Sequence, residues 1–252
     1  GGSDFSAAIF GAGLDATRIE IWTDVDGMMT TDPRLCPDAR RIKVISFDEA
    51  AELAYFGAKV LHPATVLPAI QKNIAVYVLN SQNPTCEGTK ITARAPRCSN
   101  IFKAIALKKK ITIVDVAAPR RLLVHGYLQS IFEIFDNHQV GVDVVSTSEV
   151  SVSVTAETNE AIPALAADLA KLADVKYEGR KAIVCLVGES LRDTPGIAAK
   201  VFGILEDVKI RMISQGASEI NLTFVIEEDS ATEVIRRLHK EFFAQADPEV
   251  FA

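Results

Sequence analysis

The sequence predicts an α/β fold in two parts: a parallel-type sheet with helices over residues 1–98, and a pair of similar units over residues 99–252. Two observations carry this prediction. Strand and helix patterns alternate through the first part, which is typical of a parallel sheet covered by helices. In the second part, one order of helices and strands occurs twice. A polar stretch over 80–100, with prolines and a glycine, separates the two parts.

Composition excludes several classes of protein. Of 252 residues, 48% are hydrophobic and 24% charged, which is usual for a globular chain. The net charge is −6 and basic residues cluster only at 108–110, so we expect no nucleic-acid partner. No apolar run reaches the roughly 18 residues of a membrane span, and no signal peptide is recognisable, so we expect no membrane partner. The four cysteines are far apart, which indicates free thiols, a cytoplasmic location and no zinc site.

The first part predicts six elements. Asp4 follows two glycines and can cap a helix through Leu14. Ser46 and Glu49 form the capping box of a later helix. The expected elements are a helix over 4–14, a strand over 18–22, helices over 48–57 and 63–72, a buried strand over 75–79 and an edge strand over 90–93.

The second part repeats one pattern. A helix opens at Gly126 in the first copy and at Gly196 in the second, and a Ser-Glu pair precedes the last strand of each. The first copy is expected to comprise strand 111–116, helix 126–135, strands 142–146 and 150–155, and helix 162–172; the second, strand 182–187, helix 196–205, strands 210–214 and 220–226, and helix 231–243. Each copy predicts a ferredoxin-like βαββαβ unit, which leaves sheet surface for a partner to cover. We therefore expect a homo-oligomer, a dimer or a tetramer, formed through this part.

Five motifs, in this order and spacing, resemble the aspartokinase family. They are Gly-Gly-Ser-Asp at 1–4, Trp-Thr-Asp-Val-Asp-Gly at 22–27, Thr-Thr-Asp-Pro-Arg at 30–34, Phe-Gly-Ala-Lys-Val-Leu-His-Pro at 56–63 and Ser-Thr-Ser-Glu-Val-Ser at 146–151. The resemblance implies the C-terminal, nucleotide-binding half of an amino-acid-kinase domain over 1–98, followed by two ACT regulatory domains.

In the family the first ACT unit is inserted within the second. The resemblance therefore places the first ACT domain at about 119–180 and the second at about 101–118 plus 181–246. The strand near 111–116 is then expected in the sheet of the second unit.

The resemblance also implies an activity. Aspartokinases phosphorylate L-aspartate with ATP, accompanied by Mg²⁺, to 4-phospho-L-aspartate, the first step of lysine, threonine and methionine biosynthesis. The run over 142–151 resembles the branch inhibited by lysine more than the branch inhibited by threonine. The family's Lys-Phe-Gly-Gly-Thr-Ser segment is not found in this sequence, so we expect the C-terminal part of a longer protein, inactive alone.

Two alternatives stay open beside this reading. A non-catalytic, ACT-type regulatory subunit that binds an amino acid would explain the repeat, but it would not need the kinase motifs of residues 1–80. A different amino-acid kinase, related to those for carbamate or glutamate, would lack the tandem tail.

Phosphoryl transfer needs positioned donors and neutralised charge. By resemblance, Asp4 organises the catalytic centre and Ser3 lies near the substrate; the alternative is that Asp4 only caps its helix. The nucleotide contacts implied by the resemblance are Thr23, Asp24, Met29, Arg34, Lys59 and Val60. Arg34 and Lys59 suit phosphate, although each taken alone is also typical of a solvated surface residue.

The effector site rests partly on the repeat. An amino acid carries an ammonium, and the first copy offers Asp143 where the second has Arg211. The helix that opens at Gly126 has free backbone N–H groups for a carboxylate. By resemblance the site lies at a dimer interface and comprises Leu123, Gly126, Tyr127, Leu128, Val142, Asp143 and Ser148. The alternative is that Asp143 is a solvent-facing strand residue.

No protein-bound metal is expected. His62 stands beside apolar residues and is interpreted as structural, and the other three histidines lack the spacing of metal ligands.

Overall fold

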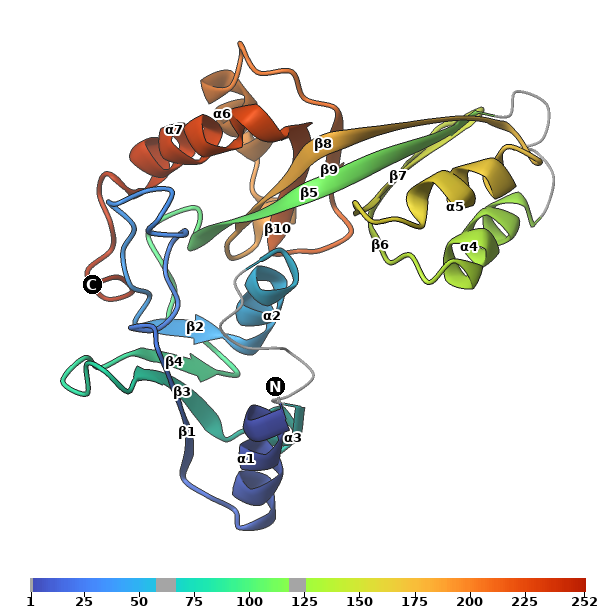
Figure 1. Cartoon of the computed structure of the whole chain (residues 1–252). Helices are drawn as coiled ribbons and strands as arrows, with labels where there is room; N and C mark the ends of the chain where they lie inside the picture. The colour runs from blue at the N-terminus through green and yellow to red at the C-terminus, as the bar shows by residue number, and fades with distance from the viewer. Residues whose placement is uncertain (1, 58–66, 118–125) are drawn as a thin grey trace.

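The computed structural model describes residues 2–57, 67–117 and 126–252. Their strands form two sheets, one of four strands in the order β1-β3-β4-β2 and one of six in the order β6-β7-β5-β8-β10-β9. Figure 1 shows the small sheet with α1 to α3 at one end of the molecule, α6 and α7 above it, and α4 and α5 at the far end of two long strands. Among the described residues, no helix is long and apolar enough to cross a membrane.

The small sheet is mixed rather than parallel. β1 (Arg18–Thr23) pairs in parallel with β3 (Ala75–Asn80), and β2 (Val44–Ser46) in parallel with β4 (Thr89–Thr92). β4 runs antiparallel to β3 and lies between β3 and β2, so the expectation of an edge strand over 90–93 was wrong. The short loop after Asn80 returns the chain directly beside β3, which imposes the antiparallel direction.

Three helices accompany this sheet: α1 (Gly2–Gly13), α2 (Phe47–Tyr55) and α3 (Leu67–Gln71). The capping box of α2 is confirmed, because Ser46 Oγ accepts from the N–H of Glu49 and Glu49 Oε2 accepts from the N–H of Ser46. α1 already begins at Gly2, so Asp4 lies within its first turn and does not cap it. The start of the helix expected over 63–72 falls outside the described residues.

Two strands of unusual length form the spine of the large sheet. β5 (Ala104–Ala117) and β8 (Asp174–Val187) pair antiparallel from end to end, with register shifts on both sides of Ile111. β7 (Ser151–Glu157) pairs with the second half of β5, and β10 (Asn221–Glu227) pairs with the second half of β8.

This pairing corrects the expected use of the first strands. Residues 111–117 lie in the sheet of the first copy, next to β7, and residues 104–108 take the corresponding place beside β8 in the second. Each first strand predicted from the sequence is therefore half of a strand that both copies share. The domain boundaries drawn from the resemblance stay a proposal.

The remaining elements agree in type with those expected. The first copy adds α4 (Tyr127–Asn137), β6 (Val142–Thr147) and α5 (Ile162–Leu169), and the second adds α6 (Ile197–Ile204), β9 (Met212–Gln215) and α7 (Ala231–Phe243), with short 3-10 turns at Leu191–Asp193 and Glu228–Ser230.

The described side chains bury two hydrophobic cores. The smaller core contains α4, α5 and one face of the adjoining strands, for example Val114, Ile131 and Leu165. The larger core is continuous from the small sheet, with Val76, to the second copy, with Leu238. The first half of the chain and the second copy therefore share one core, while most of the first copy packs in the smaller core and Val144 of β6 belongs to the larger one.

Candidate nucleotide and effector sites

The carboxyl ends of β1 and β3 meet at one edge of the small sheet, where open α/β sheets bind ligands. Thr23 and Asn80, the last residues of these parallel strands, are register partners. Asp26 Oδ1 accepts hydrogen bonds from Asn80 Nδ2 at 2.7 Å and Asn83 Nδ2 at 3.3 Å. Sequence reasoning did not single out Asp26, Asn80 or Asn83, which form this hydrogen-bond network, although polar residues directly after a buried strand were a usable signal.

One of the two residues predicted at this edge, Thr23, forms a hydrogen bond within the turn that follows β1. Thr23 Oγ1 accepts from the N–H of Val25 at 3.2 Å, while Asp24 is exposed. Gly27 has φ +119°, and a Cβ there would lie 2.4 Å from Oγ1 of Thr89. The turn therefore needs glycine, and this close approach of the backbone sets the direction in which the chain continues to Met29.

Met29 and Arg34 lie on the loop that follows. Met29 is half-buried and forms an isolated bridge with Arg41. The side chain of Arg34 is 88% exposed, and its guanidinium holds the Asp32 carboxylate, with Nη2 at 2.7 Å from Oδ2. This contact lowers the pKa of Asp32. Arg34 is thus accessible to an anion, which would have to compete with Asp32.

Of the other predicted catalytic and nucleotide residues, only some lie within the described part of the chain. Ser3 and Asp4 lie in the first turn of α1, where Ser3 Oγ donates to Asp4 Oδ1 at 3.1 Å. Lys59 and Val60, and with them His62, lie outside the described residues.

Asp143 is the most completely formed feature of the predicted effector site. Its side chain is only 5% exposed, and Oδ1 lies 2.7 Å from Nζ of Lys108. Oδ2 is buried and has no hydrogen-bond partner among the described residues. The alternative of a solvent-facing Asp143 was therefore wrong. A buried carboxylate with one unsatisfied oxygen is a favourable site for an ammonium group.

Apart from Val142, the other described effector residues lie toward the opposite end of β6. α4 and β6 are joined by only the four residues 138–141, so they run antiparallel and the start of α4 lies near the end of β6. Gly126 there has φ +87° and open space around it, and Leu128 is 42% exposed. Ser148 follows β6, about 16 Å from Asp143 at the usual strand rise.

This spacing divides the predicted site. Asp143 stands at one end of β6, whereas Gly126, Tyr127, Leu128 and Ser148 belong to the other end. Val142 packs against the same core as Tyr127. Leu123 lies outside the described residues.

The matching place in the second copy is filled by a salt bridge. Arg211 Nη1 lies 2.7 Å from Glu178 Oε2, and Nη2 lies 4.0 Å from Asp115. The contact with Glu178 raises the pKa of Arg211, which stays cationic. The second copy therefore offers an ammonium group no free anion at this place.

Comparisons with known proteins match the two parts of the chain to two different families of domain. Residues 1–80 match the amino acid kinase family, and residues 184–242 match the ACT domain. Lysine-sensitive aspartokinase 3 of Escherichia coli is 41% identical over 251 residues, covering 96% of this chain and 56% of that protein. A putative C-terminal regulatory domain of aspartate kinase from Porphyromonas gingivalis is 31% identical, with 96% of that chain covered and a TM-score of 0.51. The chain belongs to the aspartokinase family.

Solved structures of the E. coli relative share the fold. Crystal structures of aspartokinase III in complex with aspartate and ADP, and with lysine and aspartate, each superpose with a TM-score of 0.87 over 96% of this aspartokinase chain and 56% of theirs. The chain thus spans about half the length of the curated relatives it matches.

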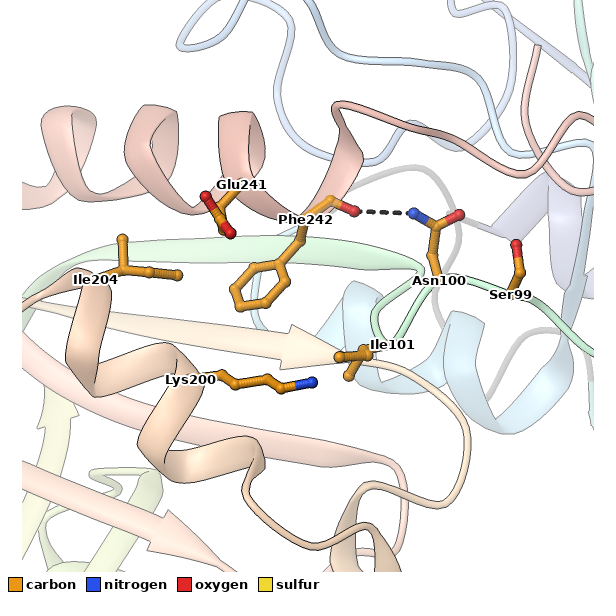
Figure 2. A pocket seen from close by; sticks show the side chains of 7 residues that line it. All are labelled: Ser99, Asn100, Ile101, Lys200, Ile204, Glu241 and Phe242. Carbon is orange, nitrogen blue, oxygen red and sulfur yellow. Dashed lines mark hydrogen bonds between the residues drawn. The ribbon is translucent and has the colours of Figure 1, made fainter.

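A hollow of about 490 Å³ lies between α6, α7 and the segment before β5 of the aspartokinase chain. Figure 2 shows its lining: Ser99, Asn100, Ile101, Lys200, Ile204, Glu241 and Phe242. Asn100 Nδ2 donates to the carbonyl of Phe242 at 2.8 Å, and Ser99 Oγ donates to Asp247. These polar groups are used in holding the C-terminal segment, and the hollow contains none of the predicted site residues.

No group of three or more His, Cys, Asp or Glu side chains among the described residues could hold a metal ion.

Proposed function

We propose that these residues form the nucleotide-binding and regulatory part of an enzyme that transfers the γ-phosphoryl group of ATP, as its Mg²⁺ complex, to the side-chain carboxylate of L-aspartate. The product is 4-phospho-L-aspartate, the first intermediate toward lysine, threonine and methionine. The E. coli relative, crystallised with aspartate and ADP, supports these substrates.

One observation carries the proposal. The chain joins a kinase-family half to a regulatory half that contains a buried, incompletely satisfied carboxylate, Asp143, directly beside the kinase-half residue Tyr55. An isolated kinase domain would not need this carboxylate. An isolated regulatory subunit would not need the ordered strand ends at Thr23 and Asn80.

Within the kinase half, we assign the nucleotide to the edge formed by β1 and β3. Thr23 and Asp24 would contact it, with Met29, Arg34, Lys59 and Val60 nearby. Arg34 supplies a planar cation for phosphate oxygens. Asp4 and Ser3, at the start of α1, would position the reacting groups, where the helix N-terminus favours negative charge.

We propose that the effector is lysine and that two protomers complete its site. Asp143 holds the α-ammonium, and the N–H groups at Gly126–Leu128 hold the carboxylate. These groups are adjacent in an amino acid but belong to opposite ends of β6 in one protomer, where Asp143 and Ser148 are about 16 Å apart by strand rise. Pairing two copies of the first unit in antiparallel fashion brings Asp143 of one protomer to Leu128 and Ser148 of the other. The E. coli structure with lysine supports this choice of effector.

If two protomers complete the effector site, the chain has to self-associate in order to bind the effector. The described surface exposes Leu128 and Phe132 on α4, and Val145 on β6. β6 is an edge strand, whose unpaired backbone groups favour pairing with another chain. We also propose a cytoplasmic location, to which the four free thiols are suited.

A coupled assay of ADP release, on the enzyme that contains these residues, tests the activity. We expect turnover with aspartate, none with glutamate, and inhibition by lysine that Asp143→Ala abolishes. Turnover that ignores aspartate, or phosphorylation of another carboxylate, would contradict the proposal.

The second candidate is a non-catalytic regulatory subunit, favoured by the likeness of the second part to the P. gingivalis domain. Titration with ADP separates the two. Binding of ADP that is weakened by Asp24→Ala supports the enzyme, whereas lysine binding without nucleotide binding supports the regulatory subunit.

A further inference from the structure

A lysine of the chain itself occupies the carboxylate that we assign to the effector. Nζ of Lys108 lies 2.7 Å from Oδ1 of Asp143, and the Lys108 side chain is 23% exposed against 5% for Asp143. An alkylammonium is the same chemical group in Lys108 and in an amino acid. The two cations therefore compete for the charge of one buried carboxylate, even if the effector binds through Oδ2.

The same carboxylate lies beside the last residue of α2. The hydroxyl of Tyr55 donates to the carbonyl of Val142 at 3.2 Å. Nζ of Lys108 lies 5.6 Å from the centre of the Tyr55 ring, within the range of a cation–π contact. Burial, and after it the negative charge of Asp143, raise the pKa of Tyr55. Lys108, Asp143 and Tyr55 thus form one cluster between β5, β6 and α2.

α2 also contacts residues in and next to the six-stranded sheet at two further points. Glu49 Oε1 lies 2.9 Å from Nζ of Lys103, and Glu52 Oε2 accepts from Asn221 Nδ2 at 2.8 Å. Glu49, Glu52 and Tyr55 are spaced by three residues, so their side chains share one side of the helix. A change at Tyr55 therefore acts on a helix that is fastened to both repeats.

We propose that Lys108 is a built-in competitor of the effector at Asp143, and that Tyr55 transmits the outcome of this competition to α2. The proposal rests on the proposed effector site. Without effector, Lys108 neutralises Asp143 and lies over the Tyr55 ring. When the effector's ammonium takes the carboxylate, Lys108 is released, and the contacts that hold the end of α2 change. Lys108 thereby sets the affinity, and Tyr55 couples binding to the kinase half.

Calorimetric titration of L-lysine into the whole chain tests the competition. Lys108→Met should bind lysine about three- to tenfold more tightly than wild type, the range expected for a partly buried ion pair. Lys109→Met removes the same charge from an adjacent, exposed position and should leave the affinity within twofold. Lys108→Gln, whose amide can still donate to Asp143, provides a second variant if the methionine variant is unstable.

Hydrogen–deuterium exchange tests the coupling. Saturating lysine should change the exchange of peptides from 47–57 in wild type and in Tyr77→Phe, a matched substitution elsewhere in the kinase half. Tyr55→Phe should bind lysine within twofold of wild type but lose this change.

The outcomes separate the two proposals. If wild type binds lysine but neither Lys108 variant gains affinity, the competition is overturned. If α2 responds equally in Tyr55→Phe, the coupling is overturned. In both cases the effector site stands. If wild type and both Lys108 variants fail to bind lysine, the effector site falls, and this inference falls with it.

Discussion

Glu49 and Lys103 form an ion pair that is almost completely withdrawn from solvent. Their charged atoms are 2.9 Å apart, and the side chains are 4% and 2% exposed. Glu49 is also the N3 residue of the capping box of α2, and Lys103 directly precedes β5. The Glu49 carboxylate therefore stabilises both the start of α2 and the point where the chain enters the six-stranded sheet.

Removal of one partner of this pair should be costly. We expect Lys103→Met to lower the free energy of unfolding by about 3–5 kcal/mol, because it leaves a buried charge uncompensated. The double variant Glu49→Gln/Lys103→Met should recover part of this loss. Urea denaturation followed by circular dichroism measures the effect. Lys72→Met, which breaks an exposed pair with Asp15, should stay within about 1 kcal/mol of wild type and serves as the control.

Effector binding should depend on the first copy alone. Asp143→Ala should weaken lysine binding at least tenfold, since about 1.4 kcal/mol is tenfold and a charge-assisted hydrogen bond contributes about 1.5–3 kcal/mol. Arg211→Ala should leave the affinity nearly unchanged, because Arg211 is engaged with Glu178. Calorimetry with lysine and threonine on the three proteins decides. Loss of binding in Arg211→Ala with retention in Asp143→Ala would place the site in the other repeat.

Self-association should run through α4. The chain of 27.3 kDa should sediment as a dimer or a larger assembly at micromolar concentration. Phe132→Glu should shift it toward monomer, because Phe132 is 36% exposed beside Leu128 on the outer side of the helix. Leu14→Glu changes an even more exposed apolar residue, directly after α1, and should have no such effect. If the wild-type chain stays a monomer at micromolar concentration, the proposed effector site between two protomers is contradicted.

Stability should fall on mild acidification through His239. Its ring nitrogen Nε2 lies 2.9 Å from Oγ1 of the buried Thr30. Burial lowers the pKa of His239 below its ordinary 6.5, Arg40 lowers it further, and Asp38 partly offsets both.

The direction of this pH dependence follows because burial favours the neutral form of His239 in the folded state. Well above pH 6.5 the histidine is neutral in both states and its contribution to stability is complete. As the pH falls below that value, the unfolded chain takes up the proton first and stability is lost. Denaturation at pH 7.5 and 5.5 should show a smaller difference for His239→Gln than for wild type. An equal difference in the two proteins would rule out His239 as the cause.

Much of the fold was determined by local sequence. The capping box at Ser46 and Glu49, the repeated helix starts at Gly126 and Gly196, and the limits of the last helix all depend on neighbouring residues, so they could be predicted. The contrast between Asp143 and Arg211 was equally visible, because it needs only the alignment of two repeats. That contrast supplied the anion of the proposed effector site, while the resemblance to the family came from the five sequence motifs.

Tertiary structure decided what depends on distant segments meeting. The inner place of β4 and the sharing of β5 and β8 by both copies follow from strand pairing, which no local pattern encodes. The same holds for the site. Lys108 and Asp143 are 35 residues apart, and Tyr55 and Val142 are 87 apart. A charge in the sequence does not reveal its partner, because only the packed chain determines which opposite charge is buried beside it.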